Sequence, residues 1–333
     1  MKAILYEGAG KIAFKDVPEP EVKEGWGLIK VSYAGICGTD LNIYAGTHPR
    51  AKAPLIIGHE FSGTMVNDYP NLPRGTRVTV YPLLSCGHCE PCKTGNAHVC
   101  NTLKLLGIDC SGGMAEYVAA PLDKIVPLDD SVSDKLGAFV EPVAVTVHAV
   151  RESKFLPGDN ALVFGCGTIG LATANTLRIL GASSVTMVEP DRSRAQIARS
   201  MGFHVIDPVE QDLEAITQNL DHNGFDWVFD CAGVQAVAKE LLAVIKVHGH
   251  IVIVAAYKKP AEMPLIQGMF KETSIQFIRV YRRKDFLIAS KIISSERNYE
   301  RIITHVLPAA EAQKGFDLLT ARGTGAIKVM FQF

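Results

Sequence analysis

The stretch ALVFGCGTIGLATANTLRIL, residues 161–180, contains the motif that decides the fold. It opens with a short apolar run typical of a buried strand and continues through G-x-G-x-x-G at residues 165–170. It ends in an amphipathic pattern typical of a helix. Gly165 permits a tight turn, Gly167 lets the backbone approach a pyrophosphate, and Gly170 allows the helix to pack closely on the strand. A strand, a turn and a helix in this order predict a dinucleotide-binding unit.

The residues after the glycine motif indicate which dinucleotide the unit binds. Thr168 and Ile169 open the predicted helix, whose free N–H groups favour an anion. A second apolar strand ends at Glu189, 19 residues beyond Gly170. A carboxylate there accepts hydrogen bonds from both ribose hydroxyls of NAD and repels the extra phosphate of NADP. The sequence therefore favours NAD, with Arg194 interpreted as flanking the adenine.

Apolar strands and helical patterns continue to alternate downstream. Strands are predicted at 225–233, 248–257 and 273–281, with a helical pattern such as 236–246 between two of them. This alternation is typical of an α/β fold with a doubly wound parallel sheet, here spanning roughly 144–281.

The two ends of the chain have a different pattern. The N-terminal part has short strands, many glycines and prolines and few helical periods, which predicts an irregular β-rich domain. The tail has helical patterns at 283–294 and 308–320 and closes with a predicted strand, AIKVMFQF.

Composition and charge exclude several classes of function. The 333 residues suffice for two domains, and 47% of them are hydrophobic. Basic and acidic residues number 34 and 35, so no overall field attracts nucleic acid or an anionic membrane. The N-terminus shows no apolar signal core and no stretch is long enough to span a bilayer. We therefore expect a cytoplasmic protein without nucleic-acid or membrane partners.

Four cysteines gather in SCGHCEPCKTGNAHVC, residues 85–100, with the spacing C-x2-C-x2-C-x7-C. A reducing compartment disfavours disulfides, and the last gap of seven differs from the usual iron–sulfur spacing. Zinc is favoured, and four thiolates close its coordination shell, so the metal has a structural role. His88 and His98 are then bystanders. The predicted ligands are Cys86, Cys89, Cys92 and Cys100.

A second, more dispersed set points to an open metal site. GICGTD contributes Cys37, and IIGHEF contributes His59 and Glu60. Glu141 lies in the otherwise apolar stretch FVEPVAVTVHAV, where an unpaired carboxylate is costly to bury. Glu141 is either a metal ligand, the holder of a metal-bound water, or a solvent-facing residue before Pro142. One thiolate, one imidazole and a carboxylate suit a catalytic zinc with a free position.

These motifs resemble, in order and separation, those of the zinc-containing medium-chain alcohol and polyol dehydrogenases. The matching pieces are GICGTD, GHEFSG, the four-cysteine segment, GGMAEY, VEPVAV, GCGTIG with Glu189, and AIKV. The resemblance implies a GroES-like catalytic domain from 1–143 and 282–333, with the structural zinc lobe at 85–100. It also implies a Rossmann domain at 144–281.

The resemblance also assigns roles to residues. It implies one catalytic zinc at Cys37, His59, Glu60 and Glu141, besides the structural zinc. Glu60 and Glu141 remain alternatives for direct ligation. Thr39 matches the position that relays the substrate proton, although it could instead cap the helix that starts near Asp40. The family implies an NAD-dependent enzyme and a homodimer or homotetramer.

The pair Glu141-Pro142 resembles sorbitol, galactitol-phosphate and butanediol dehydrogenases, so we expect a polyol, sugar alcohol or vicinal diol as substrate. A phosphorylated polyol or a simple secondary alcohol is the alternative within this class. A zinc-scaffolded binding protein is the alternative outside it. A metal-free quinone reductase would lack Cys37 and His59.

Overall fold

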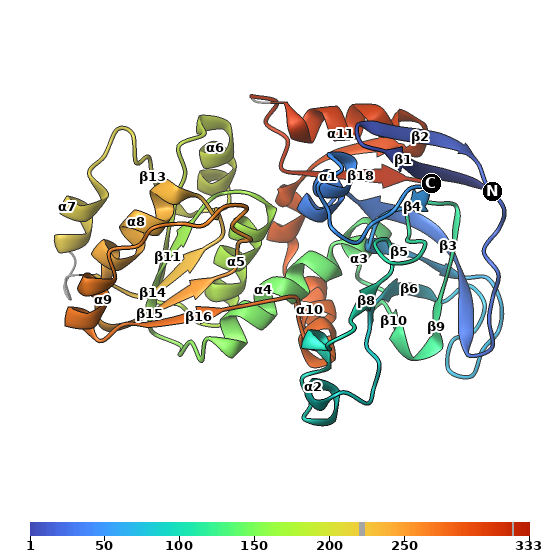
Figure 1. Cartoon of the computed structure of the whole chain (residues 1–333), viewed down its shortest axis with the longest axis horizontal. Coiled ribbons are helices and arrows are strands. Elements are labelled where there is room, and N and C mark those ends of the chain that lie inside the picture. The colour runs from blue at the N-terminus through green and yellow to red at the C-terminus, as the bar shows by residue number, and fades with distance from the viewer. Residues whose placement is uncertain (220–223, 322) are drawn as a thin grey trace. The chain divides into compact units, whose positions relative to one another are not determined.

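The computed structural model describes residues 1–219, 224–321 and 323–333. The chain divides into two compact units. The first combines Met1–Ala144 with Arg282–Phe333, and the second is Val145–Tyr281. In Figure 1 the blue N-terminal and red C-terminal segments lie together in the first unit. None of the helices in the described ranges is both long enough and apolar enough to cross a membrane.

Six parallel strands form the sheet of the second unit, in the order β13-β12-β11-β14-β15-β16. Their bounds are β11 Asn160–Phe164, β12 Ser184–Val188, β13 His204–Ile206, β14 Phe225–Asp230, β15 Ile245–Ile253 and β16 Ser274–Phe277. This order confirms the predicted doubly wound Rossmann sheet. In such a sheet the ligand lies beyond the carboxyl ends of the strands, where the order reverses, here between β11 and β14.

Helices connect these strands and cover the sheet. They are α5 Thr168–Ile179, α6 Arg192–Ser200, α7 Leu213–Gln218, α8 Gln235–Val244 and α9 Leu265–Lys271. Helix α5 packs on β11 and β12, and α8 packs on β14 and β15 (Figure 1). Buried aliphatic and aromatic side chains fill the space between strands and helices, among them Leu162, Val228 and Leu241. The central strands β11 and β14 are buried over most of their length, because both faces of the sheet are covered.

Two of the predicted strands end earlier than their apolar patterns suggest. Strand β15 ends at Ile253, because the next two N–H groups both bond to the carbonyl of Asp230. Strand β16 ends at Phe277, and Val280 has a φ of 45°, in the left-handed region and outside the β region. Apolar composition persists in these segments although the backbone has left the sheet.

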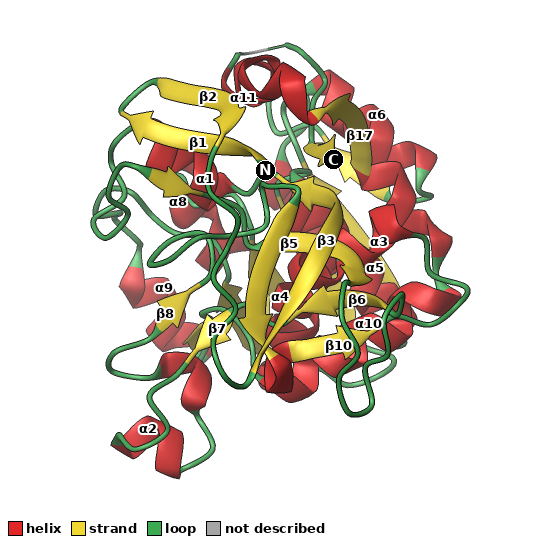
Figure 2. Ribbon diagram, turned by 90° about the vertical axis from the view of Figure 1, so that its right-hand side faces the viewer, coloured by secondary structure: helices red, strands yellow, loops and turns green. Residues whose placement is uncertain are grey.

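A mostly antiparallel, seven-stranded sheet forms the centre of the first unit. Its order is β10-β6-β5-β3-β18-β17, and β9 also pairs with β3. Figure 2 labels β10, β6, β5 and β3 of this sheet. The bounds are β3 Trp26–Gly35, β5 Glu60–Met65, β6 Arg77–Val80, β9 Tyr117–Pro121, β10 Ile125–Pro127, β17 Ile303–Pro308 and β18 Lys328–Gln332. Strands β18 and β17 come from the tail, so both segments of this unit share one sheet.

Smaller sheets complete the β-rich unit. They are β2-β1-β4 and β7-β8, with β1 Lys2–Gly8, β2 Lys11–Asp16, β4 Leu55–Ile56, β7 Leu83–Leu84 and β8 Lys104–Leu105. Its helices are short at the N-terminal side: α1 Gly38–Tyr44, α2 Glu90–Lys93 and α3 Asp134–Ala138. Helix α4 follows as Val140–Glu152.

The tail contains the two predicted helices and one strand that was not predicted. Helix α10, Arg283–Ser295, confirms the pattern at 283–294. Helix α11 is Ala312–Thr320 and begins later than predicted. The reason is that β17 runs to Pro308 and pairs in parallel with β18, and a 3-10 turn intervenes before α11.

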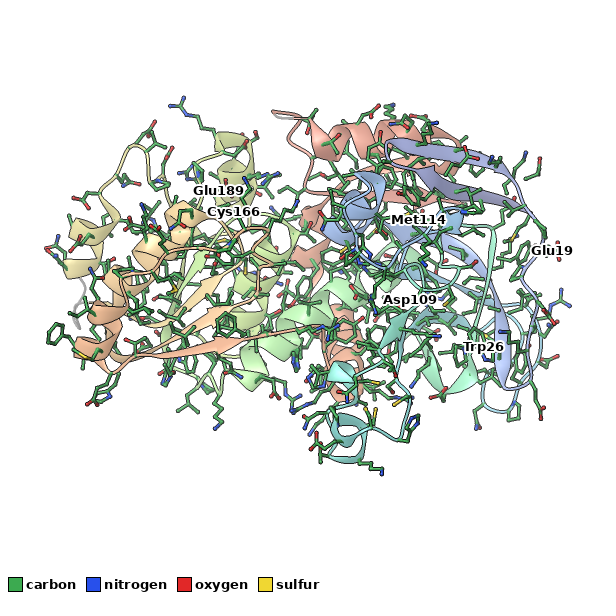
Figure 3. All side chains as sticks on the ribbon, in the orientation of Figure 1. Glu19, Trp26, Asp109, Met114, Cys166 and Glu189 are labelled. Carbon is green, nitrogen blue, oxygen red and sulfur yellow. The ribbon has the colours of Figure 1, made fainter. Side chains whose placement is uncertain are left out.

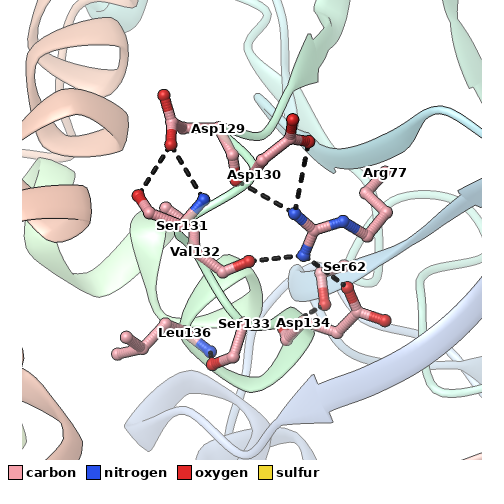
Figure 4. A network of polar contacts seen from close by, with 9 residues as sticks. All are labelled: Ser62, Arg77, Asp129, Asp130, Ser131, Val132, Ser133, Asp134 and Leu136. Atoms are coloured by element: carbon pink, nitrogen blue, oxygen red, sulfur yellow. Dashed lines mark hydrogen bonds and ion pairs between the residues drawn. The ribbon is translucent and has the colours of Figure 1, made fainter.

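Arg77 on β6 anchors the loop that leads into α3 and α4 (Figure 4). Its guanidinium donates to the carbonyls of Val132 at 2.5 Å and Asp129 at 3.0 Å, and lies 3.5 Å from an Oδ1 of Asp134. Ser62 on β5 donates to the Asp134 carbonyl. This network fixes the start of α3 against β5 and β6, and with it the segment that carries Glu141.

Candidate functional site

The glycine motif has the geometry that its three positions predict. Gly165 has a φ of 94°, which favours glycine. A Cβ on Gly170 would lie 1.8 Å from the carbonyl oxygen of Gly165, so this position must be glycine for α5 to pack on β11. A Cβ on Gly167 would meet nothing within 4 Å, which leaves open space beside the backbone. Residues from one turn thus provide both close packing and room for a ligand.

The start of α5 is suited to an anion. Gly167 is the N-cap and supplies no side-chain cap, and Thr168 and Ile169 are the first two helical residues. An uncapped helix start presents N–H groups and the positive end of the helix dipole. A pyrophosphate fits this end of the helix.

Glu189 directly follows β12, at the carboxyl edge of the sheet. Its Oε2 accepts the N–H of Cys166 at 2.6 Å, and its Oε1 accepts the N–H of Asp191 at 3.0 Å. Figure 3 labels Cys166 and Glu189, which lie together beside the glycine loop. The side chain is only 6% exposed, so the two backbone donors hold the carboxylate in one orientation. Arg194 is exposed on α6, and its own N–H bonds to Asp191.

Three candidate metal ligands meet in the first unit. Cys37 is the N-cap of α1, His59 precedes β5, and Glu60 is the first residue of β5. Their ligand atoms all lie within 4.8 Å of one another. His59 and Glu60 are 4% and 2% exposed. Cys37 and His59 are far apart in the sequence but close in the structure, because β3 pairs with β5. This pairing places Gly35 opposite Glu60.

Two buried polar atoms next to this set have no hydrogen-bond partner: Nδ1 of His59 and Oδ1 of Asp40, which lie 3.9 Å apart. Burial by itself lowers the pKa of His59, but the neighbouring charges of Cys37 and Asp40 outweigh it and raise that pKa well above its ordinary value. Burial also raises the pKa of Asp40. A thiol, an imidazole and carboxyl groups concentrated in a buried space fit a divalent cation.

Two of the roles that the sequence left open, Thr39 as a helix cap and Glu141 as a solvent-facing residue, are wrong. Thr39 does not cap α1, because the helix begins at Gly38 after the N-cap Cys37, whose N–H donates to Asp40 at 2.8 Å. Asp40 is the capping residue, and the half-buried Thr39 is the second residue of the helix. Glu141 does not face solvent, because it is 6% exposed in the first turn of α4.

Glu141 lies near the metal-ligand set without belonging to it. Its charge acts on His59, although it is not among the three residues whose ligand atoms lie within 4.8 Å of one another in the described ranges. Sequence reasoning identified this carboxylate from its apolar surroundings, and the same signal was available for Lys328 in the strand AIKVMFQF.

Lys328 was missed, and it contacts the site directly. Its ammonium donates to Glu60 Oε1 at 2.9 Å, to Glu60 Oε2 at 2.6 Å and to the carbonyl of Ile36 at 2.9 Å. Burial by itself lowers the pKa of Lys328, but the charges of Glu60 and Cys37 outweigh it and raise that pKa. The lysine is therefore a buried cation two strands away from Glu60 in the same sheet.

The cysteine cluster has the dimensions of a tetrahedral zinc site. The Sγ atoms of Cys89 and Cys92 are 3.4 Å apart, those of Cys89 and Cys100 are 3.7 Å apart, and those of Cys86 and Cys92 are 4.0 Å apart. Tetrahedral zinc with bonds of about 2.3 Å requires S···S distances of roughly 3.8 Å. His88 and His98 do not belong to the set. Four thiolates around one centre fit a closed, structural metal.

Backbone N–H groups favour the thiolate form in this cluster. The N–H groups of His88 and Cys89 lower the pKa of Cys86 to about 5. Cys86 in turn donates its N–H to the sulfur of Cys100 at 3.3 Å, which lowers the pKa of that thiol. Desolvation raises the pKa of Cys92 to about 12, so without a metal the Cys92 thiol retains its proton. A bound cation would remove this proton, because only the thiolate is a ligand.

We predict that Cys92→Ser loses one zinc ion per chain while the zinc near Cys37 and His59 remains. Structural zinc contributes on the order of 10 kcal/mol in small zinc modules, so the melting temperature of the variant should fall. Elemental analysis and thermal unfolding measure the two effects. Cys110→Ser, a free half-buried cysteine outside the cluster, is the control. Full metal content and unchanged melting of Cys92→Ser would contradict the structural role.

Comparisons with known proteins agree with this geometry. The family "Alcohol dehydrogenase GroES-like domain" matches residues 23–130, and the family "Zinc-binding dehydrogenase" matches residues 168–295. L-threonine 3-dehydrogenase of Bacillus velezensis is 31% identical over 98% of both chains. Sorbitol dehydrogenase of Halalkalibacterium halodurans is 31% identical over 99% of this chain and 98% of its own.

A solved structure extends the likeness to the whole fold. The crystal structure of 2R,3R-butanediol dehydrogenase from Bacillus subtilis superposes with a TM-score of 0.92 at 30% identity, covering 100% of this chain and 99% of its own. This likeness confirms the predicted fold class, which combines a GroES-like domain with a Rossmann domain. Since the likeness runs from one end of the sequence to the other, the chain belongs to the zinc-binding medium-chain dehydrogenases, oxidoreductases that act on CH–OH groups.

Proposed function

We propose that the protein oxidises a secondary hydroxyl of a vicinal diol, polyol or sugar alcohol to a ketone, reversibly, with NAD as the hydride acceptor. The observation that carries the substrate class is the buried carboxylate of Glu141 close enough for its charge to act on His59. A fixed carboxylate beside the reacting hydroxyl accepts a hydrogen bond from a second one. A site built for such a bond disfavours substrates that lack the second group.

The relatives support this class through the substrates in their names. Sorbitol and 2,3-butanediol have neighbouring hydroxyls, and threonine has an amino group next to its 3-hydroxyl. Each thus offers a polar group beside the reacting carbon. A simple mono-alcohol does not.

The catalytic roles follow from the residues at the candidate site. Cys37, His59 and Glu60 would hold zinc, with Glu141 as the neighbouring carboxylate. Bound zinc would supply a Lewis acid for the substrate oxygen. Thr39, two residues after Cys37, relays the hydroxyl proton: its Oγ1 accepts this proton while its own hydroxyl proton passes on toward solvent. Asp40, whose Oδ1 lies 3.9 Å from Nδ1 of His59, would orient this imidazole on closing to hydrogen-bond distance when the metal binds. Arg77 and Ser62 hold the segment before Glu141 in place.

The cofactor is held by the second unit. The glycine loop and the start of α5 bind the pyrophosphate, and Glu189 accepts hydrogen bonds from the ribose hydroxyls. Each carboxylate oxygen of Glu189 has one lone pair left after its backbone bond. A phosphate on the ribose would meet this fixed negative charge, which supports NAD over NADP.

We predict that Glu141→Ala lowers kcat/KM for a vicinal diol more than for a mono-alcohol. One hydrogen bond to a charged group contributes roughly 1.5–3 kcal/mol, which is about ten- to a hundredfold in rate. Steady-state kinetics with 2,3-butanediol, sorbitol and 2-butanol measure the difference, and zinc content is determined on the same sample. Glu152→Ala, at the other end of α4, controls for the loss of an acidic side chain. Equal losses for both substrate types with zinc retained would refute the role in recognition.

We predict that Glu189→Ala weakens NAD binding and reduces the preference for NAD over NADP by about ten- to a hundredfold. The ribose acceptor and the repulsion of phosphate are lost together. The ratio of kcat/KM for the two cofactors is the measurement. Glu210→Ala, an exposed acidic residue of the same unit, is the control. A wild-type enzyme that prefers NADP would overturn the role of Glu189.

A further inference from the structure

Asp230 is a fully buried carboxylate at the carboxyl end of β14. Its Oδ1 accepts the N–H groups of Ala232 and Gly233, both at 2.9 Å. Its Oδ2 accepts the hydroxyl of Tyr257 at 2.6 Å. A buried carboxylate costs free energy that an apolar residue at the end of the strand would avoid. The value of Asp230 therefore lies in the segments that its hydrogen bonds join.

Asp230 joins the segments that follow two neighbouring parallel strands. Residues 231–233 form the turn after β14, and residues 254–257 follow β15. The main-chain carbonyl of Asp230 accepts the first two N–H groups of the second segment, both at 3.0 Å. The hydroxyl of Tyr257 brings the end of that segment back to the side chain of the same residue. One aspartate thus fixes both segments, through its main chain and its carboxylate.

The turn 231–233 is packed between the glycine loop and the segment after β15. On one side, a Cβ on Gly165 would lie 3.4 Å from the Cβ of Ala232, so the turn is in contact with the glycine loop. On the other side, a Cβ on Gly233 would lie 2.9 Å from the Cβ of Ala255, too close for a side chain. The spacing of three loops therefore depends on how this turn is held.

These loops lie at the carboxyl edge of the sheet, where the strand order reverses between β11 and β14. A dinucleotide lies across such a point, with one mononucleotide on each half of the sheet. Glu189 follows β12 and is the acceptor for the adenosine ribose, so the adenosine half belongs to the side of β11 to β13. The side of β14 to β16 is left for the nicotinamide half. The segments that Asp230 joins follow β14 and β15, on this second side.

We propose that Tyr257 is a positioning residue that acts through Asp230. Together they hold the turn 231–233 and the segment 254–257 at the spacing that the nicotinamide half of the cofactor requires. The inference rests on the cofactor assignment of the proposed function. Burial and the neighbouring carboxylate raise the pKa of the half-buried Tyr257, so its phenol keeps the proton that it donates. Phenylalanine at this position would fill the same space, but Asp230 would lose one of its three donors.

The test measures cofactor binding to the full-length zinc protein without turnover. Isothermal titration calorimetry gives the dissociation constants of NADH and of ADP, which keeps the adenosine and the pyrophosphate but lacks the nicotinamide riboside. In Tyr257→Phe we expect NADH to bind about tenfold more weakly, while ADP binds within about twofold of wild type. Tyr69→Phe, at a half-buried tyrosine of the first unit, is the control and should bind both ligands as wild type does.

A double-mutant cycle tests the link between the tyrosine and the aspartate. Asp230→Ala removes the acceptor of the turn and of the phenol, so NADH binding should weaken at least as much as in Tyr257→Phe. The double variant Asp230→Ala/Tyr257→Phe should bind NADH within about twofold of Asp230→Ala, because the tyrosine acts through that carboxylate. Asp230→Asn should recover most of the affinity, because its amide can accept from the turn and donate to the phenol oxygen.

Three results would overturn the inference. Equal weakening of NADH and ADP in Tyr257→Phe would show a general loosening of the second unit, and unchanged NADH binding would show that the hydroxyl has no part in holding the cofactor. Additive losses in the cycle would show that Tyr257 acts independently of Asp230. If Asp230→Ala does not fold, the comparison of NADH with ADP in Tyr257→Phe still decides. A wild-type protein that binds neither ligand would instead refute the cofactor site itself, independently of Tyr257.

Discussion

The buried ion pair between Glu60 and Lys328 is the constraint on which the first unit depends. It joins residues 268 positions apart and requires β5, β3 and β18 to be paired in one register. The same register places Glu60 beside His59 and opposite the end of β3, just before Cys37. A shift of one residue would turn Glu60 to the other face of the sheet. The sheet and the metal-ligand set are therefore determined together.

Much of the second unit could be predicted from local sequence. The glycine motif requires a particular turn, and apolar runs require burial, so strand, loop and helix follow from short segments. The ends of β15 and β16 could not be predicted, because they depend on a carbonyl of another strand and on the backbone conformation of Val280. These are tertiary effects that an apolar pattern does not contain.

The candidate site was predictable where the residue types are unusual in themselves. Clustered cysteines, a His-Glu pair and a carboxylate in an apolar stretch each indicate their chemistry. The roles of Asp40, Gly35 and Lys328 at the site depend on His59 and Glu60, which lie in another segment of the chain. Strand β17 was missed for a similar reason, since it is defined by its pairing with β18. A single sequence does not show which distant strands become neighbours.

The interrupted first unit has a consequence for the order of folding during synthesis. Val145–Tyr281 is one continuous segment and can complete its sheet as soon as it has left the ribosome. The sheet of the first unit must wait for β18, and until then the edge of β3 beside Gly35 lacks its partner strand. Lys328 is therefore the last partner to reach Glu60, and the candidate metal site of the first unit can be completed only after β18 has left the ribosome.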